Sequence, residues 1–300
     1  MKFGLEINDF EFPGGPTQMA EHLSTMGRTA EDVGFDSLWV WDHFVQLRQW
    51  DKALLEGWVM LGYLAGATQR AMLGTLVTGV TYRYPAILVK QATTLDVLSG
   101  GRAYLGIGAA WNEREHHSFG VPFPPLRERF ELLEDALQIA HRAWKGERGA
   151  FEGKKVSLTE QVDVPPPIQQ PHPRILIGGG GEKKTLRLVA QYGDATHCGN
   201  GPEDYARKME ILRGHCEAVG RDFGEIERTT GLDTTAPGRK DQMADPGLLV
   251  ERIGRLAEVG AQHLLFTIPG QWQPEVLERF GREVIPQVRE LSGELAGAAA

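Results

Sequence analysis

The chain has 300 residues, of which 41% are hydrophobic and 24% are charged, and its formal net charge is −8. This is the composition of a globular protein with a sizeable core, which excludes a disordered chain. The length suits one large α/β domain spanning residues 1–300, and the acidic balance, without a long run of Lys and Arg, excludes a nucleic-acid partner.

Targeting and membrane signals are missing from the sequence. The first twenty residues lack the basic and apolar regions of a signal peptide, and no segment reaches the roughly 20 apolar residues that span a bilayer. We therefore expect a soluble cytoplasmic protein with no membrane partner. The two cysteines, Cys198 and Cys216, are expected to be free thiols, as is usual in a reducing compartment.

Short apolar segments rich in strand formers alternate along the chain with segments of helical periodicity. The predicted strands are, in order, Lys2–Asn8, Ser37–Asp42, Met72–Val80, Arg102–Ala110, Arg174–Ile177, Ala195–Cys198, Ile226–Leu232 and His263–Ile268. The predicted helices that follow them are Thr17–Val33, Trp58–Ala67, Ala86–Leu98, Leu126–Trp144, Glu182–Tyr192, Asp204–Val219, Leu248–Val259 and Pro274–Leu291.

Eight strands that alternate with eight helices predict a (β/α)₈ TIM barrel, because parallel neighbours need crossovers and closure removes the sheet edges. Two insertions interrupt the alternation: an irregular segment after the fourth strand, Trp111–Pro125, and a proline-rich segment before the fifth, Gly149–Pro173. A doubly wound open sheet is the alternative. The first strand is not followed by the G-x-G-x-x-G of a dinucleotide fold, which favours the barrel.

In such a barrel the carboxyl ends of all strands share one rim, where catalytic residues gather. The second strand ends there in Asp42 and His43. An imidazole can give or take a proton at neutral pH, and a neighbouring carboxylate favours the charged ring. The structural alternative is that Asp42 caps a turn and His43 is a hydrogen-bonded wall residue.

The run Gly178–Gly181 joins the fifth strand to its helix. Glycines let the backbone approach a ligand closely, and the helix N-terminus favours an anion, most simply a phosphate. Lys183 and Lys184 oppose the helix dipole unless an anion is present, and Thr185 could add a hydroxyl. A flexible turn would also use glycines.

Two further clusters invite a functional interpretation. Glu113, Glu115, His116 and His117 do not follow a metal-site spacing, so we interpret them as solvated loop residues and expect no metal. Among the tryptophans, only Trp41 and Trp111 lie near the rim, where they could stack on a flat cofactor, whereas most tryptophans simply bury area.

Several long segments, taken in order, resemble proteins of the luciferase-like monooxygenase superfamily. Within this superfamily they resemble the branch that uses the deazaflavin coenzyme F420. They are FDSLWVWDHF, LGTLVTGVTYRYPAILVKQATTLDVLSGGRAYLGIGAAWNEREH, PPLRERFELLEDALQIA, ILIGGGGEKKTLRLVAQYGDA and HCEAVGRD. The resemblance covers nearly the whole chain. It implies a luciferase-like barrel that holds F420 at its rim and passes a hydride between the cofactor and a small-molecule substrate.

The resemblance also implies roles for individual residues. His43 would be the active-site histidine, with Asp42 orienting it, and a bulge with a non-prolyl cis peptide would fall at Leu76 and Val77. The predicted cofactor-binding residues are Leu76, Val77, Thr78, Gly108, Ala109, Ala110, Asn112, Gly178, Gly179, Gly180 and Thr185.

One departure from the family concerns the substrate. Sugar-phosphate dehydrogenases of the family carry a glutamate in the loop after the fourth strand, where this chain reads GAAWNE. Glucose 6-phosphate is therefore doubtful as substrate. The second and third helices form a dimer interface in the family, so a homodimer is expected. An FMN-dependent monooxygenase and a non-catalytic flavin or deazaflavin carrier remain the alternative functions.

Overall fold

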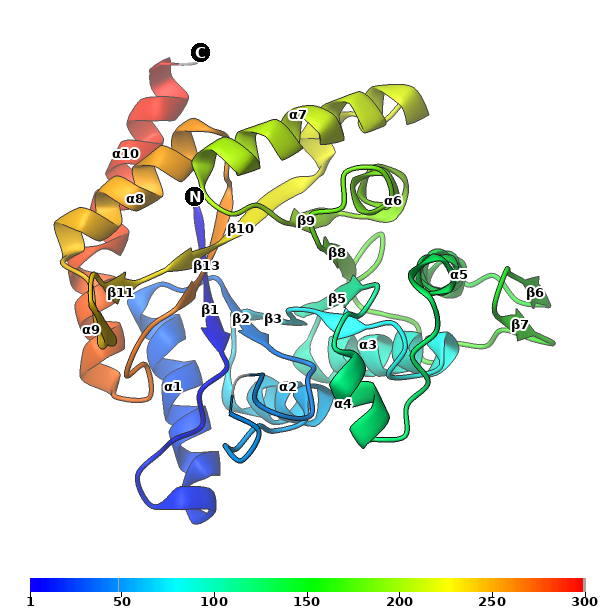
Figure 1. The fold of residues 1–300 in the computed structure, drawn as a ribbon, viewed down its shortest axis with the longest axis horizontal. Helices are drawn as coiled ribbons and strands as arrows, with labels where there is room; N and C mark the ends of the chain where they lie inside the picture. The colour runs from blue at the N-terminus through cyan, green and yellow to red at the C-terminus, as the bar shows by residue number, and fades with distance from the viewer. Residues whose placement is uncertain (48, 299–300) are drawn as a thin grey trace.

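The computed structural model describes residues 1–47 and 49–298. In this part of the chain, eight parallel barrel strands surround a central axis and helices cover them on the outside (Figure 1). The barrel strands are β1 (Lys2–Ile7), β2 (Ser37–Val40), β3 (Met72–Thr75) continued by β4 (Thr78–Gly79), β5 (Ala103–Gly108), β8 (Arg174–Gly178), β9 (Ala195–His197), β10 (Glu227–Asp233) and β13 (His263–Thr267). The (β/α)₈ fold predicted from the sequence is confirmed.

The order of the strands shows how the barrel closes. It runs β3-β2-β1-β13-β10-β9-β8-β5-β4, and an additional pairing of β3 with β5 joins the two ends of the sheet. Leu73 pairs with Ala103 and Gly74 with Tyr104 across this junction. Because every barrel pairing is parallel, all carboxyl ends lie on one rim.

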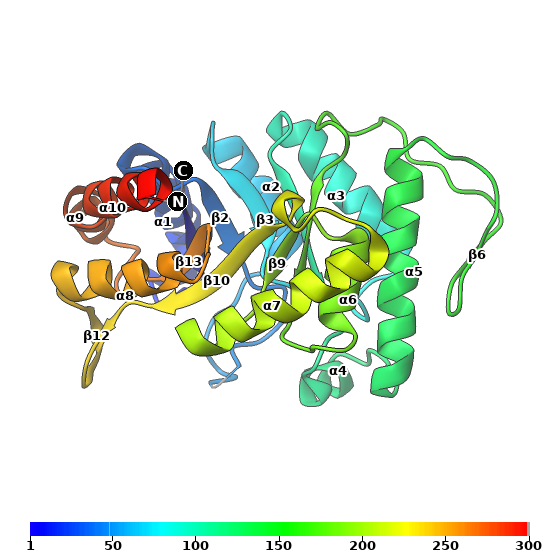
Figure 2. The ribbon, with the colours of Figure 1, turned by 90° about the horizontal axis from the view of Figure 1, so that it is seen from above.

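The helices of the outer layer follow the strands in turn, and Figure 2 shows them from above. They are α1 (Met19–Val33), α2 (Gly57–Ala67), α3 (Pro85–Ser99), α4 (Glu113–Ser118), α5 (Leu126–Trp144), α6 (Thr185–Tyr192), α7 (Pro202–Val219), α8 (Pro246–Glu258), α9 (Pro274–Glu283) and α10 (Ile285–Ala298), with 3₁₀ turns η1 (Gly15–Thr17) and η2 (Phe223–Glu225). No helix of the described residues has the length and apolarity that a membrane crossing requires.

Four sequence predictions need correction. The first predicted helix, Thr17–Val33, begins later than expected, because Thr17 belongs to η1 and α1 starts at Met19. The predicted last helix is two helices, and Pro286 at the start of α10 explains the break, since proline cannot continue a helix from the preceding turn. The segment Trp111–Pro125 contains α4, and the loop before α8 contains the hairpin β11 (Thr235–Ala236) and β12 (Arg239–Met243).

The predicted insertion before the fifth barrel strand, Gly149–Pro173, is confirmed, and its first part is a short hairpin. Its strands, β6 (Phe151–Glu152) and β7 (Ser157–Leu158), project beyond α5 in Figures 1 and 2. The carboxylate of Asp135 on α5 accepts hydrogen bonds from the backbone N–H groups of Lys154, Lys155 and Val156 in the turn. The hairpin is thereby fixed to α5, on the outside of the barrel.

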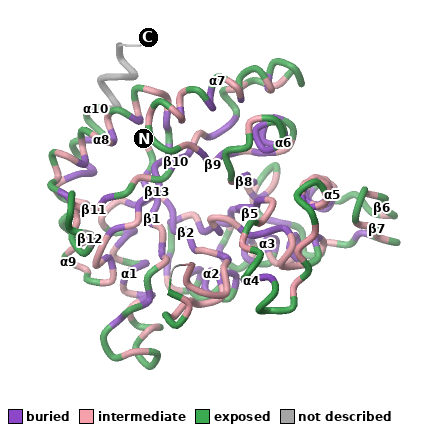
Figure 3. The backbone as a smooth tube through the Cα atoms, viewed as in Figure 1, coloured by how far each residue is buried: buried purple, intermediate pink, exposed green. Residues whose placement is uncertain are grey.

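Buried residues concentrate on the strands and on the inner faces of the helices (Figure 3). A small second core fills the barrel itself, and it contains Trp39, Tyr104, Leu176, Ala195 and Leu265. Trp39 is completely buried there, and its indole N–H donates to Ser37 Oγ at 2.8 Å. A Cβ on Gly74 would lie 2.7 Å from the Trp39 ring, so glycine at this position makes room for the indole.

Candidate active site

A cavity of about 590 Å³ opens at the carboxyl ends of β4, β5 and β8. Its wall contains most of the residues that the sequence predicted for a cofactor site. These are His43, Leu76, Val77, Thr78, Gly108, Ala109, Ala110, Gly178, Gly179 and Thr185. Trp111 and Gly181, which the sequence placed near the rim and in the glycine run, also line it. The residues of the wall to which sequence reasoning gave no cofactor role are Glu6, Gly79, Tyr82, Leu126, Phe130 and His197.

The break between β3 and β4 forms one wall of this cavity. The peptide bond between Leu76 and Val77 is cis, as the family resemblance predicted. The Val77 side chain packs directly against the backbone of Gly108 on β5 and of Gly178 on β8. A Cβ would lie 3.0 Å from it at Gly108 and 2.8 Å from it at Gly178, so a side chain at either position would displace it. Because both residues are glycine, the Val77 side chain can lie close to β5 and β8, where it forms an apolar part of the cavity wall.

The glycine loop Gly178–Gly181 lies between β8 and α6. Gly179 has φ 123°, a backbone conformation that side chains rarely permit. A Cβ on Gly181 would lie 2.8 Å from the Thr185 hydroxyl, and one on Gly180 would lie 2.7 Å from the Lys208 ammonium. The loop thus has no room for side chains, and it exposes backbone at the N-terminus of α6, where an anionic group binds favourably.

His43 stands in the cavity wall immediately after β2, and a carboxylate from another loop holds its ring. The distance from His43 Nδ1 to Glu115 Oε2 is 2.7 Å. A carboxylate only accepts hydrogen bonds, so Nδ1 carries the hydrogen and Nε2 is the nitrogen that can take up a proton. Glu115 is completely buried on α4, and its other oxygen accepts from the backbone N–H of Phe44 and of Val45.

Tyr82 completes this cluster around Glu115. Its hydroxyl donates to Glu115 Oε2 at 2.5 Å and lies 3.5 Å from His43 Nδ1. Burial alone would raise the pKa of Glu115, but the hydrogen bonds from His43 and Tyr82 lower it below its usual value. Burial and the neighbouring carboxylate raise the pKa of Tyr82. Glu115 is therefore ionised at neutral pH, and Tyr82 keeps its hydrogen.

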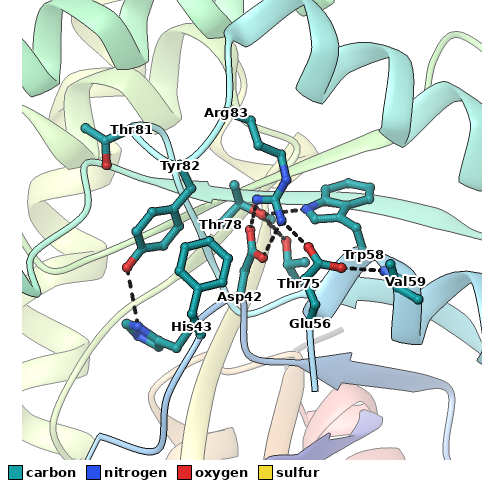
Figure 4. A network of polar contacts seen from close by, with 12 residues as sticks. Asp42, His43, Glu56, Trp58, Val59, Thr75, Thr78, Thr81, Tyr82 and Arg83 are labelled. Carbon is teal, nitrogen blue, oxygen red and sulfur yellow. Dashed lines mark hydrogen bonds and ion pairs between the residues drawn. The ribbon is translucent and has the colours of Figure 1, made fainter. Parts of the chain in front are cut away.

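Asp42 does not contact His43, which corrects the prediction that it orients the ring. Its carboxylate forms a two-pronged ion pair with Arg83, with Nη1–Oδ2 at 2.5 Å and Nη2–Oδ1 at 2.9 Å (Figure 4). Arg83 also pairs with Glu56, whose carboxylate caps α2 by accepting from the Val59 N–H. Both residues follow the end of β2 at Val40, where the Asp42 carboxylate lies with Arg83 and the His43 ring lies with Glu115. Glu115 occupies the position expected for Asp42.

Two predicted cofactor residues do not line the cavity. Asn112 is the N-cap of α4, and its side chain accepts from the backbone N–H of Glu115 at 3.3 Å. A Cβ at Gly180 would point toward Lys208. Asn112 instead holds the helix that carries the His43 partner.

The cluster of acids and histidines on α4 is only partly solvated, which corrects a second prediction. Glu115 and His116 are completely buried, and His116 Nε2 lies 2.6 Å from the Thr81 hydroxyl. Glu113 and His117 are exposed. The residues described in the structure contain no group of three His, Cys, Asp or Glu side chains arranged to hold a metal ion.

A second cavity, of about 700 Å³, opens beside the first over β1, β10 and β13. Glu6, at the end of β1, lines both cavities. Its carboxylate accepts from the Trp41 indole, from Thr267 Oγ1 at 3.1 Å and from Asn8 Nδ2 at 3.5 Å. The two cavities therefore meet at a buried carboxyl group, a short way along the rim from His43, and burial raises the pKa of that carboxyl.

His197 gives the site an expected response to acid. Burial, and then the charge of His263, lowers the pKa of His197 to about 4. Because its ordinary pKa is 6.5, the unfolded chain binds one more proton between these values, so stability is lost as the pH falls through this window. We expect the loss to reach about 2 to 3 kcal/mol near pH 4. Urea denaturation at several pH values should show a shallower dependence for His197→Gln, and an unchanged dependence would contradict the assignment.

Comparison with known proteins gives matches over nearly the whole chain. The family model described as luciferase-like monooxygenase matches residues 1–249. A protein named F420-dependent glucose-6-phosphate dehydrogenase from Kineococcus radiotolerans is 31% identical, over 96% of this chain and 97% of that protein. A protein of the same name from Microbacterium testaceum is 28% identical, over 97% and 98%.

The fold has solved counterparts. The structure of a coenzyme F420-dependent tetrahydromethanopterin reductase from Methanopyrus kandleri superposes with a TM-score of 0.78 and covers 96% of this chain and 99% of that one, at 18% sequence identity. At this identity the likeness concerns the fold.

Proposed function

The chain belongs to the luciferase-like monooxygenase family, and from that membership we propose that it is an F420-dependent oxidoreductase. It transfers a hydride between coenzyme F420 and a small organic substrate at the carboxyl rim of the barrel. The choice of F420 is supported by relatives named F420-dependent dehydrogenases, which align with this chain over almost their full length.

The observation that carries the proposal is a single cavity lined by a glycine loop, an apolar wall and an oriented imidazole. The loop Gly178–Gly181 suits the anionic tail of the cofactor, because exposed N–H groups and a helix N-terminus favour negative charge. The side chains of Leu76 and Val77 suit one face of a flat ring. Bound F420 would supply the two-electron carrier, and the protein supplies position and proton handling.

The roles of the site residues follow from their contacts. His43, through Nε2, is the group that exchanges a proton with substrate or cofactor, because Nδ1 is engaged by Glu115. Glu115 is a positioning residue, since it touches His43 and backbone but does not line the cavity. In the loop after β5, which reads GAAWNE, Ala109, Ala110 and Trp111 line the cavity, and none of them supplies a carboxylate.

A cofactor titration tests the proposal without a known substrate. Purified apoprotein is titrated in parallel with F420 and with FMN, and binding is followed through quenching of tryptophan fluorescence, to which Trp41 and Trp111 near the rim should contribute. We expect tight binding of F420 and weaker binding of FMN. Tight binding of FMN with none of F420 would instead support an FMN-dependent monooxygenase.

A glycine-loop variant controls for binding elsewhere on the protein. Gly181→Val brings a branched side chain against the Thr185 hydroxyl, where even a Cβ would lie 2.8 Å away. It should weaken F420 binding, whereas Gly214→Val on α7, where a Cβ meets nothing within 4 Å, should not. Equal affinity of the two variants would contradict this location of the cofactor.

We also propose a homodimer that forms through α2 and α3. α2 is apolar almost throughout, α3 is largely apolar, and the two helices pack against each other on the outside of the barrel. Val59 is 75% exposed and Ile87 is 56% exposed, together with Tyr84 and Leu98. Exposed apolar side chains on two adjoining helices are a feature of surfaces that bind another protein.

Charge placed on this surface should separate the protomers. We expect Val59→Asp with Ile87→Asp to convert a dimer into a monomer in sedimentation velocity, because two buried unpaired carboxylates per protomer would oppose association. Val219→Asp, at an exposed apolar position at the end of α7, is the matched control and should leave the dimer intact. A double variant that stays dimeric would place the interface elsewhere.

A further inference from the structure

A second histidine faces the cofactor cavity from the side opposite His43. His197 is the last residue of β9, and it lines the cavity. In the strand order of the barrel, three strands separate β9 from β2 in either direction, β10, β13 and β1 on one side and β8, β5 and β3 on the other. Because His43 follows β2, the two imidazoles approach the cavity from opposite sides of the barrel (Figure 1).

The ring of His197 lies inside the barrel. Ala195, two residues earlier on β9, belongs to the small core within the barrel, together with Trp39 and Tyr104. Residues two apart on a strand face the same side of the sheet. His197 therefore lies above that core, where it forms part of the inner end of the cavity.

One edge of the ring is held and the other is open. Nδ1 lies 2.9 Å from the Thr229 hydroxyl on β10, and among the described residues no protein group forms a hydrogen bond with Nε2. On the same face of β10, beyond Thr229, a Cβ on Gly231 would lie 3.8 Å from Nε2 and from Cε1. On β8, the residue paired with His197 is Gly178. Both neighbouring strands thus place a glycine beside the ring, which leaves the Nε2 edge uncovered.

The open edge belongs to a neutral imidazole. Burial, and then the charge of His263, lowers the pKa of His197 to about 4, so the ring carries no charge near pH 7. A neutral ring has one N–H and one bare nitrogen, and the Thr229 hydroxyl can donate to Nδ1 or accept from it. In either form, Nε2 has one hydrogen bond left for an uncharged polar group.

The deazaflavin ring of F420 has such a group. Its faces are flat and apolar, which suits the wall at Leu76 and Val77, but its pyrimidine edge carries two carbonyl oxygens and an N–H. Burial of these groups inside a barrel is costly unless each finds a hydrogen-bond partner. The anionic tail suits the glycine loop at the N-terminus of α6, so the polar edge of the ring is the part left for the inner end of the cavity.

We propose that His197 is a cofactor-binding residue whose Nε2 forms a hydrogen bond with the pyrimidine edge of the deazaflavin ring. This inference rests on the proposed function, and it extends the cofactor site from the glycine loop and the apolar wall to the inside of the barrel. The contact fixes the ring between His197 on one side and His43 on the other.

Titration with two ligands tests the contact, with binding followed through tryptophan quenching. The ligands are F420 and the deazaflavin head, which has the same ring but lacks the phosphate tail. His197→Leu fills the space without a hydrogen-bonding nitrogen, and it should weaken the binding of both ligands by about tenfold. His197→Gln can place its amide near the position of Nε2 and should retain most of the affinity. His117→Leu, at an exposed histidine on α4, is the matched control and should bind as wild type.

A variant at Gly231 tests the same contact with the imidazole in place. Gly231→Val covers the Nε2 edge, so it should also weaken the binding of F420. Combined with His197→Leu, it should add little to the loss, because both changes remove one interaction. Thermal melting confirms that each variant is folded.

Nitrogen NMR of protein labelled in its histidine rings observes the contact directly, without turnover. The resonances of His197 are those that are missing from His197→Leu. Addition of F420 should shift the Nε2 resonance more than that of Nδ1, because Nδ1 keeps its partner Thr229.

The contrary results are distinguishable. A wild-type protein that binds no F420 refutes the proposed function, and this inference with it. If the wild type binds F420, unchanged affinity in folded His197→Leu or an unshifted Nε2 resonance overturns the inference alone. A loss confined to F420, with the deazaflavin head bound as before, also overturns it, because the contact would then involve the tail.

Discussion

Replacing His43 with Ala is expected to lower the rate of hydride transfer by about 10²–10⁴-fold while F420 still binds. The ring lies in the wall of the cofactor cavity, and its Nδ1 donates to a buried carboxylate, so the reactive Nε2 is held in one orientation. Removing the ring removes the proton acceptor or donor, but the glycine loop and the apolar wall are unchanged.

Two measurements separate chemistry from binding. F420 affinity comes from tryptophan quenching, and the rate of hydride transfer comes from the change in deazaflavin absorbance with a substrate that the wild-type protein turns over. His117→Ala, at an exposed histidine on α4, is the matched control and should behave as wild type. If His43→Ala keeps the wild-type rate, the ring has no catalytic role.

The positioning role of Glu115 can be tested in the same assay. Glu115→Gln keeps the shape of the side chain but removes the charge that holds the Nδ1 hydrogen. We expect a smaller loss of rate than for His43→Ala, with the pH profile displaced, because the imidazolium would lose its carboxylate partner. The remaining alternative is a non-catalytic carrier. In that case the protein would bind F420, but neither the wild type nor either variant would transfer a hydride.

Asp42→Asn is expected to destabilise the fold by about 3 to 5 kcal/mol, because it leaves the Arg83 guanidinium partly buried without its main partner. The Asp42 side chain is fully buried, and Arg83 is 12% exposed. Burial raises the pKa of Asp42, and the guanidinium of Arg83 opposes that rise. Urea denaturation measures the change in the free energy of unfolding.

A surface pair and a double variant control this prediction. Asp32→Asn breaks an ion pair with Arg70 of similar type, but both partners are largely exposed, so a change below about 1 kcal/mol is expected. Asp42→Leu with Arg83→Met removes both buried charges and should recover much of the stability. A small loss for Asp42→Asn, together with a large loss of catalytic rate, would restore the role in catalysis that the structure argues against.

The sequence was sufficient for the fold because its signals are local. Each barrel strand is a short apolar run, and each helix has apolar residues at steps of three and four, so the alternation is visible without any tertiary contact. The predicted helix boundaries are wrong where a single residue interrupts the helical pattern of apolar residues. Pro286, which separates α9 from α10, is an example. The cis peptide at Leu76 and Val77 followed from the family resemblance and not from local pattern.

The partners of His43 could not be predicted in the same way. Glu115 lies 72 residues further along the chain, and Tyr82 is 39 residues away, so their contacts depend on how two rim loops fold together. One local signal was available. Asn112 and Glu115 have the spacing of a helix N-cap and its third residue, which indicates the start of α4. Burial of Glu115, however, comes only from packing against the loop after β2.

The rim is divided between two neighbouring cavities, and this division has a consequence for evolution. The groups that hold His43 come from the loops after β2, β3/β4 and β5, whereas the second cavity is also walled by β10 and β13, which carry none of them. Mutations at the ends of β10 and β13 can therefore change the shape and charge of the second cavity without touching the groups that hold the imidazole. The walls contributed by β10 and β13 can therefore vary in evolution while the cluster around His43 stays unchanged.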